Sequence, residues 1–209
     1  MHLIFIEYFN IKEIINLISH LSLIKIFNTM KKTLSLAVLM MCLVFVSVNV
    51  VSAQKALEPK PSPMALIKAN LDGAYVSVTY SQPHRKDRTI FGELVPFGKI
   101  WRLGANEATQ LTTTSDVQFG DKTLKAGTYT VFCVPEKDQW TFVFNTVLGQ
   151  WGTYQYDASK DVLKVMVKTA ATTDLWEPFT MKFEKPDGKK TNLVVMWENT
   201  MVSVPVMAK

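Results

Sequence analysis

The stretch ALIKANLDGAYVSVTY, residues 65–80, has the pattern of a β-hairpin. Asp72-Gly73 supplies the positive φ angles that a two-residue type I′ turn requires. That turn pairs Leu71 with Ala74, Ala69 with Val76, and Ile67 with Val78. These apolar residues share one face of the hairpin, and polar residues occupy the other face. Because turn and alternation agree, the sequence predicts two antiparallel strands with one apolar face.

Similar patterns continue toward the C-terminus. Gly120-Asp121 predicts a second hairpin, with Val117 opposite Leu124 and Phe119 opposite Lys122. Alternation predicts further strands at residues 128–135, 140–145, 162–168, 179–183, 193–198 and 201–206.

No helical period longer than a turn or two follows Gln54, although residues 151–160 could form a short helix or an irregular loop. Pro205 limits the last strand to an edge or a terminus. About nine or ten short strands with frequent turns predict an all-β fold, either a sandwich or a barrel-like roll. We expect an antiparallel two-sheet sandwich of the jelly-roll kind over residues 64–209.

Residues 30–54, MKKTLSLAVLMMCLVFVSVNVVSAQ, have the layout of a secretory signal peptide. Two lysines precede an apolar run, and the small residues Val51-Ser52-Ala53 precede Gln54. We therefore expect residues 30–53 to direct export and to be removed, which places the mature chain in the periplasm or outside the cell. A Pro-rich tether over residues 54–63 would then lead into the domain.

Residues 1–29 are crowded with Ile, Leu, Phe, Asn and Lys, and contain no Gly, Pro, Ala or Val. We expect this segment to be a spurious upstream extension, translated from a start codon set too early. In the alternative interpretation the start is genuine and residues 34–52 are retained as a membrane anchor.

The charge of the mature chain argues against nucleic acid as a partner. The first 53 residues hold four of the 23 basic and two of the 18 acidic side chains, which leaves a net charge of +3. So small and dispersed a charge gives no phosphate-binding stripe. One cysteine, Cys133, remains after the leader, and its place in a strand pattern predicts a buried, unreactive thiol.

A long segment without alternation, SQPHRKDRTIFGELVPFGKIWRLGANEAT, covers residues 81–109. Ordered irregular segments of this length often build binding surfaces. This one holds every histidine and arginine that follows the leader. Together with Trp151, which lies between two glycines in a later loop, it supplies the candidate binding residues Arg88, Trp101, Arg102, Asn106 and Glu107.

Several motifs of the chain resemble those of a known family. They are RTIFGELVPFG (88–98), WRLGANEAT (101–109), KAGTYTVFCVP (125–135), NTVLGQWG (145–152) and WENTMVSVP (197–205). In this order they are similar to the exported bacterial family, common in Bacteroidetes-type bacteria, that is catalogued as domain of unknown function 2911. The resemblance covers residues 64–206 and implies an exported β-rich domain with no established activity and no catalytic residues.

The residues of the mature chain also exclude several kinds of chemistry. His84 is its only imidazole and no G-x-S-x-G elbow is present, so a Ser-His or Cys-His mechanism lacks its parts. One histidine and one cysteine are too few to form a metal site of His and Cys ligands. The chain has no P-loop or G-x-G-x-x-G motif, so the sequence gives no sign of a nucleotide site. We expect no metal, no cofactor and no enzyme activity. The remaining enzymatic alternative is a hydrolase that uses Glu93 and Glu107, with Arg88 as a candidate third residue. It requires the carboxyl groups of Glu93 and Glu107 to lie about 5–10 Å apart.

Two other functions stay open. In the first, the domain binds a glycan or another small polar molecule through Arg102, Asn106 and Glu107, beside Trp101 and Trp151. In the second, it is a scaffold for an envelope protein, in which Arg102 and Glu107 form a buried ion pair that pins the irregular segment and Asn106 caps backbone groups. The sequence does not separate these two.

Overall fold

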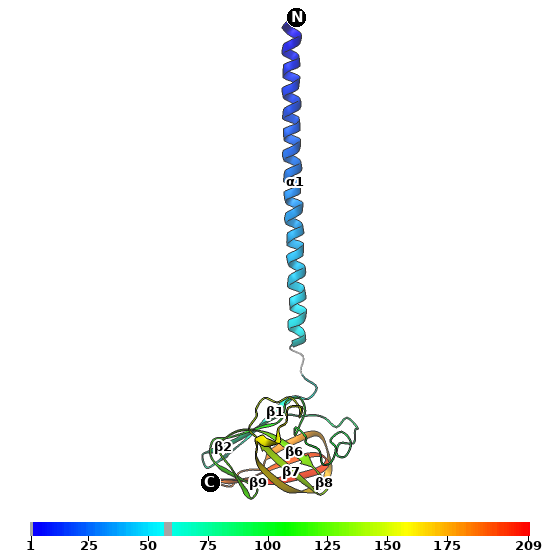
Figure 1. The fold of residues 1–209 in the computed structure, drawn as a ribbon. Helices are drawn as coiled ribbons and strands as arrows, with labels where there is room; N and C mark the ends of the chain where they lie inside the picture. Colours follow the sequence, from blue (N-terminus) through cyan, green and yellow to red (C-terminus); the bar gives the residue numbers. More distant parts are fainter. Residues whose placement is uncertain (1, 57–59) are drawn as a thin grey trace. The chain divides into compact units, whose positions relative to one another are not determined.

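The computed structural model describes the backbone of residues 2–56 and 60–209, and the side chains of residues 13–42 and 60–209. The chain divides into two compact units, Met1–Pro59 and Lys60–Lys209. The first contains one 55-residue helix, α1 (His2–Ala56) (Figure 1). No helix in the described residues combines the length and apolarity needed to span a bilayer.

The leader and tether remain predictions. Residues 30–53 lie within α1. The side chains of the predicted cleavage site lie outside the described residues, as do residues 57–59 of the predicted tether. Export, cleavage and the early start codon are not tested by this helix.

The second unit is built from nine antiparallel strands and one short 3-10 helix, η1 (Ala158–Lys160), which lies in the region where a short helix or loop is expected. The strands are β1 (Met64–Leu71), β2 (Ala74–Ser81), β3 (Gln110–Thr113), β4 (Val117–Phe119), β5 (Lys122–Leu124), β6 (Gly127–Pro135), β7 (Gln139–Asn145), β8 (Asp161–Phe183) and β9 (Lys190–Ala208). Their order in the sheet is β1-β2-β3-β6-β7-β8-β9-β4-β5. The predicted all-β class of this unit is confirmed.

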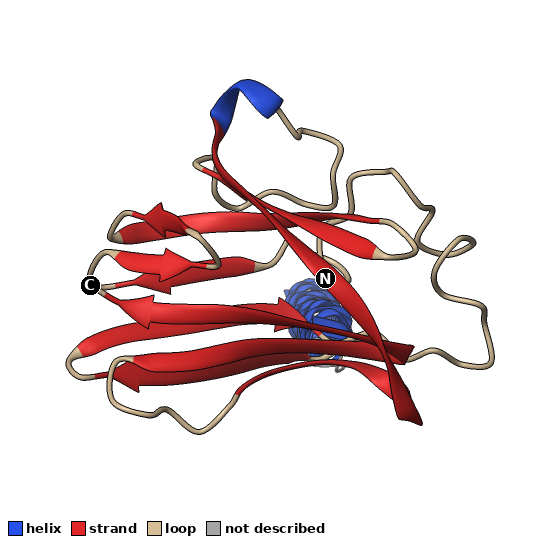
Figure 2. Cartoon of the chain, turned by 90° about the horizontal axis from the view of Figure 1, so that it is seen from below, coloured by secondary structure: helices blue, strands red, loops and turns tan. Residues whose placement is uncertain are grey.

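Two separate sheets are not confirmed, because the hydrogen-bonded ladder runs without a break through all nine strands. The strands predicted at residues 162–168 and 179–183 are parts of β8, and those at 193–198 and 201–206 are parts of β9. β8 pairs first with β7 and then with β9, and its register shifts on both sides of Trp176. Such bulges bend a strand without ending it. In Figure 2, β8 leaves η1 and crosses the other strands obliquely.

Both predicted hairpins are confirmed in register. Strands β1 and β2 pair Leu71 with Ala74, and β4 and β5 pair Val117 with Leu124. The alternation of the first hairpin points its apolar residues inward, since Leu71 and Val76 have no exposed surface. Local turn chemistry and a buried face therefore fix these registers.

One apolar core draws residues from all nine strands. Trp140 and Trp197 are buried in it, as their alternation predicts. Cys133 is also buried, which confirms the predicted burial of this side chain. Its burial raises the pKa of the thiol. The irregular segment between β2 and β3 attaches to this core through Trp101, which forms a backbone bridge with Cys133.

Candidate functional site

Two irregular loops pair with each other outside the strands. Glu107 forms an isolated backbone bridge with Trp151. On either side, Ala108 N donates to Gln150 O over 2.9 Å and Gly152 N donates to Asn106 O over 3.2 Å. We call the side chains carried by residues 102–107 and 150–154 the Glu107–Trp151 site.

The first loop approaches β2 closely. Gly104 has a φ of 152°, and a Cβ there would lie 2.8 Å from the backbone oxygen of Ser81, so only glycine fits. Asn106 adopts a φ of 55°, which asparagine tolerates better than most residues. Its Nδ2 donates to Ser62 O (3.2 Å) and Ser81 Oγ (3.4 Å). Asn106 thus bonds one backbone oxygen, as a capping residue would, and one side-chain hydroxyl.

The second loop carries two exposed aromatic rings. Trp151 is 53% exposed and Tyr154 is 88% exposed. A Cβ on Gly152 would lie 3.1 Å from Cε2 of Tyr154 and 3.9 Å from Nη1 of Arg102. The Tyr154 ring and the Arg102 guanidinium therefore both approach the backbone of Gly152.

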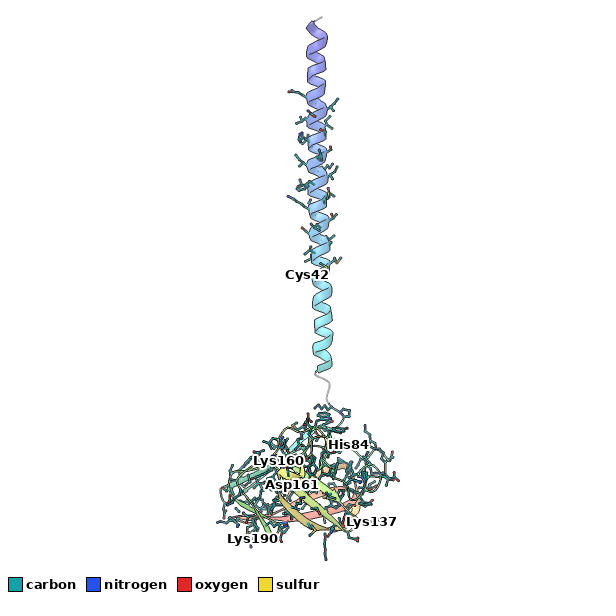
Figure 3. The ribbon with its side chains drawn as sticks, in the orientation of Figure 1. Cys42, His84, Lys137, Lys160, Asp161 and Lys190 are labelled. Atoms are coloured by element: carbon teal, nitrogen blue, oxygen red, sulfur yellow. The ribbon has the colours of Figure 1, made fainter. Side chains whose placement is uncertain are left out.

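A buried polar network anchors this second loop at its base. Asn145 is fully buried, accepts from Val147 N (3.0 Å), and donates to Asp157 O and Asp161 Oδ1 (both 2.9 Å). Tyr156 Oη donates to Asp161 Oδ2 over 2.7 Å. Burial and this hydrogen bond raise the pKa of Tyr156. Asp161, labelled beside Lys160 in Figure 3, thus ties the loop to the start of β8.

Three buried polar atoms in this site have no hydrogen-bond partner. They are Arg102 Nε, Glu107 Oε2 and Gln150 Oε1, out of four such side-chain atoms in the described part of the chain. The fourth, Arg85 Nε, lies 3.5 Å from Glu177 Oε2. Buried polar groups are nearly always satisfied, so each exception calls for an explanation. All three atoms are buried from solvent, and Gln150 is only 2% exposed as a whole residue.

Lys60 contacts both sides of the site. Its Nζ lies 2.9 Å from Glu107 Oε1 and 5.3 Å from the centre of the Trp151 ring. The hydrogen bond from Lys60 lowers the pKa of Glu107. Next to Glu107 is a small cavity of about 180 Å³, lined by Met64, Thr79, Tyr80, Ser81, Glu107, Ala108 and Gln110.

Four of the six predicted binding residues come together here: Arg102, Asn106, Glu107 and Trp151. Trp101 does not join them. It is 8% exposed, stacks on Trp197 with ring centres 5.9 Å apart, and donates from Nε1 to Gly104 O. Its ring therefore offers no free face to a ligand.

Arg88 also lies outside the site. Its guanidinium donates to the backbone oxygens of Arg85 (2.9 Å) and His84 (2.7 Å), and so braces its own loop, where Figure 3 labels His84. The expected ion pair between Arg102 and Glu107 is not found among the described residues, since Glu107 pairs with Lys60 instead. Glu93 is an exposed residue of the turn that Val95 N closes by donating to Ile90 O.

Sequence reasoning missed Lys60, Gln150 and Tyr154. Tyr154 shares a glycine-containing loop with Trp151, which could have drawn attention to it. Nothing local in the sequence marks Lys60 as a partner of Glu107. Across the described residues, no group of three or more His, Cys, Asp or Glu side chains is placed to hold a metal ion.

The family described as "Protein of unknown function (DUF2911)" matches residues 62–206. No curated protein and no solved structure matches the chain.

Proposed function

The chain belongs to the DUF2911 family of unknown function, and we propose that its β domain is a noncatalytic binding domain for a small polar molecule of glycan type. One observation carries this proposal: the half-exposed ring of Trp151 and the partly exposed carboxylate of Glu107 stand on two loops that a backbone bridge pairs. A sugar hydroxyl could donate to the exposed oxygen of Glu107 while the sugar ring packs against Trp151.

The side-chain types suit sugars. An aromatic face packs against the C–H face of a sugar ring, while planar guanidinium, carboxylate and amide groups hydrogen-bond to hydroxyls. Trp151 and Tyr154 offer such faces, and both are exposed. The cavity of about 180 Å³ is smaller than the 300–1,000 Å³ typical of drug-sized ligands. We therefore infer that one or two sugar rings are bound against the surface.

The proposed setting is the periplasm or the cell exterior. It rests on the signal-peptide pattern of residues 30–53. Glycans of the bacterial envelope are the ligands that such a location would supply.

A carboxylate-pair hydrolase is less well supported. Glu107 accepts from Lys60, which lowers its pKa and keeps the carboxyl ionised, whereas the general acid of a glycosidase requires a raised pKa. Glu93 lies on a separate turn. The scaffold alternative makes a different prediction for Arg102, which is given in the Discussion.

NMR titration of the purified protein with soluble envelope glycans tests the site directly. Binding as proposed shifts the backbone amide signals of Glu107 and Gly152. The signals of the β4–β5 hairpin, which carries none of the site residues, serve as the internal control. Shifts confined to that hairpin, or to other surfaces, would contradict the assignment.

A further inference from the structure

Lys60 occupies the Glu107–Trp151 site in the manner of a ligand. Its ammonium group lies 2.9 Å from Glu107 Oε1 and 5.3 Å from the centre of the Trp151 ring. The backbone around it is also held, since Asn106 Nδ2 donates to Ser62 O and Gln82 N donates to Pro63 O. The segment that precedes β1 therefore lies along the first loop of the site.

An aromatic face next to a carboxylate is a general arrangement for recognising a cationic amine. The ring quadrupole attracts the cation, and the carboxylate accepts a charge-assisted hydrogen bond from it. In this chain both partners come from loops that are fixed to each other by the backbone bridge. The arrangement does not depend on Lys60 for its geometry.

The contact with Lys60 is open to exchange. The Lys60 side chain is 56% exposed and that of Glu107 is 40% exposed, and solvent-exposed pairs contribute little to stability. Glu107 Oε2 is buried, so the carboxylate presents Oε1, the oxygen that Lys60 bonds, to solvent. An incoming amine can therefore replace Lys60 at Glu107 Oε1 and at the exposed ring of Trp151.

We propose that the Glu107–Trp151 site selects sugars that carry a free ammonium group, and that Lys60 holds the ammonium position until such a ligand displaces it. This inference rests on the proposed glycan-binding function and specifies its ligand class. An amino sugar meets the requirement, whereas its N-acetylated form carries no charge and does not.

The matched probes are the glucosamine tetramer and the N-acetylglucosamine tetramer, titrated calorimetrically into the purified protein. The wild-type protein should bind the glucosamine tetramer more tightly. Lys60→Met removes the internal competitor and should tighten that binding about five-fold, as expected for a partly exposed cation–π and ion-pair contact. Lys68→Met, an exposed lysine of β1, removes the same charge and serves as the control, with no change in affinity.

Glu107→Gln gives the opposite variant. It should weaken the glucosamine tetramer about ten-fold, as for loss of a charge-assisted hydrogen bond, and weaken the N-acetylated tetramer much less, because the amide oxygen of Gln still accepts from a sugar hydroxyl. An unchanged melting temperature of this variant would show that the fold is intact.

Three results overturn the inference. If the N-acetylated tetramer binds as tightly as the glucosamine tetramer, glycan binding stands but ammonium selection fails. If Lys60→Met does not tighten binding of the glucosamine tetramer, Lys60 is not a competitor. Failure of both tetramers on every variant would also overturn it, and the wider ligand panel described below would then decide the proposed function separately.

Discussion

Glu107 and Trp151 face each other across a backbone bridge that joins two loops far apart in the chain. Backbone hydrogen bonds at Ala108 and Gly152 flank this bridge. The backbones of Glu107 and Trp151 are therefore held opposite each other by main-chain pairing. Side-chain substitutions at either position should leave that pairing in place, so binding and stability can be tested independently.

Trp101 and Trp151 should respond differently to truncation. Trp101→Ala removes a ring that is packed in the core and should cost about 3–5 kcal/mol of the free energy of unfolding. Trp151→Ala removes a half-exposed ring and should cost less than about 1 kcal/mol. Urea denaturation of both variants measures the difference. Equal losses would contradict the placement of the two rings.

Gly152→Ala should be more harmful than Gly149→Ala. Both glycines have positive φ angles, 67° and 70°, so both variants share the backbone penalty of about 1–2 kcal/mol. A Cβ on Gly152 additionally meets the Tyr154 ring at 3.1 Å, whereas a Cβ on Gly149 meets nothing within 4 Å. Thermal unfolding should show a larger loss for Gly152→Ala, and ligand binding should fall in that variant alone. Similar behaviour of the two would argue that Tyr154 does not pack there.

The Arg102→Ala variant distinguishes the binding function from the scaffold function. If Arg102 were clamped on a buried carboxylate, its removal would strand that carboxylate and cost about 3–5 kcal/mol. Instead its Nε has no partner, and it forms none of the ion pairs found among the described residues. We expect a loss of about 1 kcal/mol or less in unfolding free energy, together with loss of ligand binding. A loss above about 3 kcal/mol would favour the scaffold.

The ionisation of Glu107 should depend on Lys60. The hydrogen bond from Lys60 lowers the pKa of Glu107 below its ordinary value of 4.5. A lowered folded-state pKa stabilises the fold above the ordinary pKa, and this contribution is lost as the pH falls through the lowered value. In Lys60→Met the pKa of Glu107 should rise toward 4.5. A ¹³C NMR titration of the Glu107 carboxyl measures both values, and identical titrations in the two proteins would rule out the contact.

The sequence predicted those parts of the fold that local chemistry decides. Asp72-Gly73 determines a turn, and the turn with its alternating neighbours determines the register of β1 and β2. The length of β8 is different. Its bulges around Trp176 depend on pairing with β9, a long-range contact that no local pattern records.

In the candidate site, too, local sequence predicts some features and long-range contacts decide the others. Glu107 and Trp151 were predicted as site residues because each stands in an irregular, glycine-containing segment, which is where binding residues concentrate. Trp101 was assigned wrongly to the site, because a residue outside any periodic strand gives no sign of which way its ring points. It lies under the irregular segment, against Trp197. The partner of Glu107 was also missed, since Lys60 precedes the domain's first strand.

The most direct test of a binding site at Glu107 and Trp151 is thermal unfolding of the purified protein against a panel of soluble glycans, peptidoglycan fragments and small polar metabolites. A ligand at about one hundred times its dissociation constant adds about 2.7 kcal/mol. For a domain of this size, that raises the melting temperature by several degrees. We predict such a rise for at least one sugar, and its loss in both Trp151→Ala and Glu107→Ala. No rise across the panel, or a rise that persists in both variants, would contradict the account.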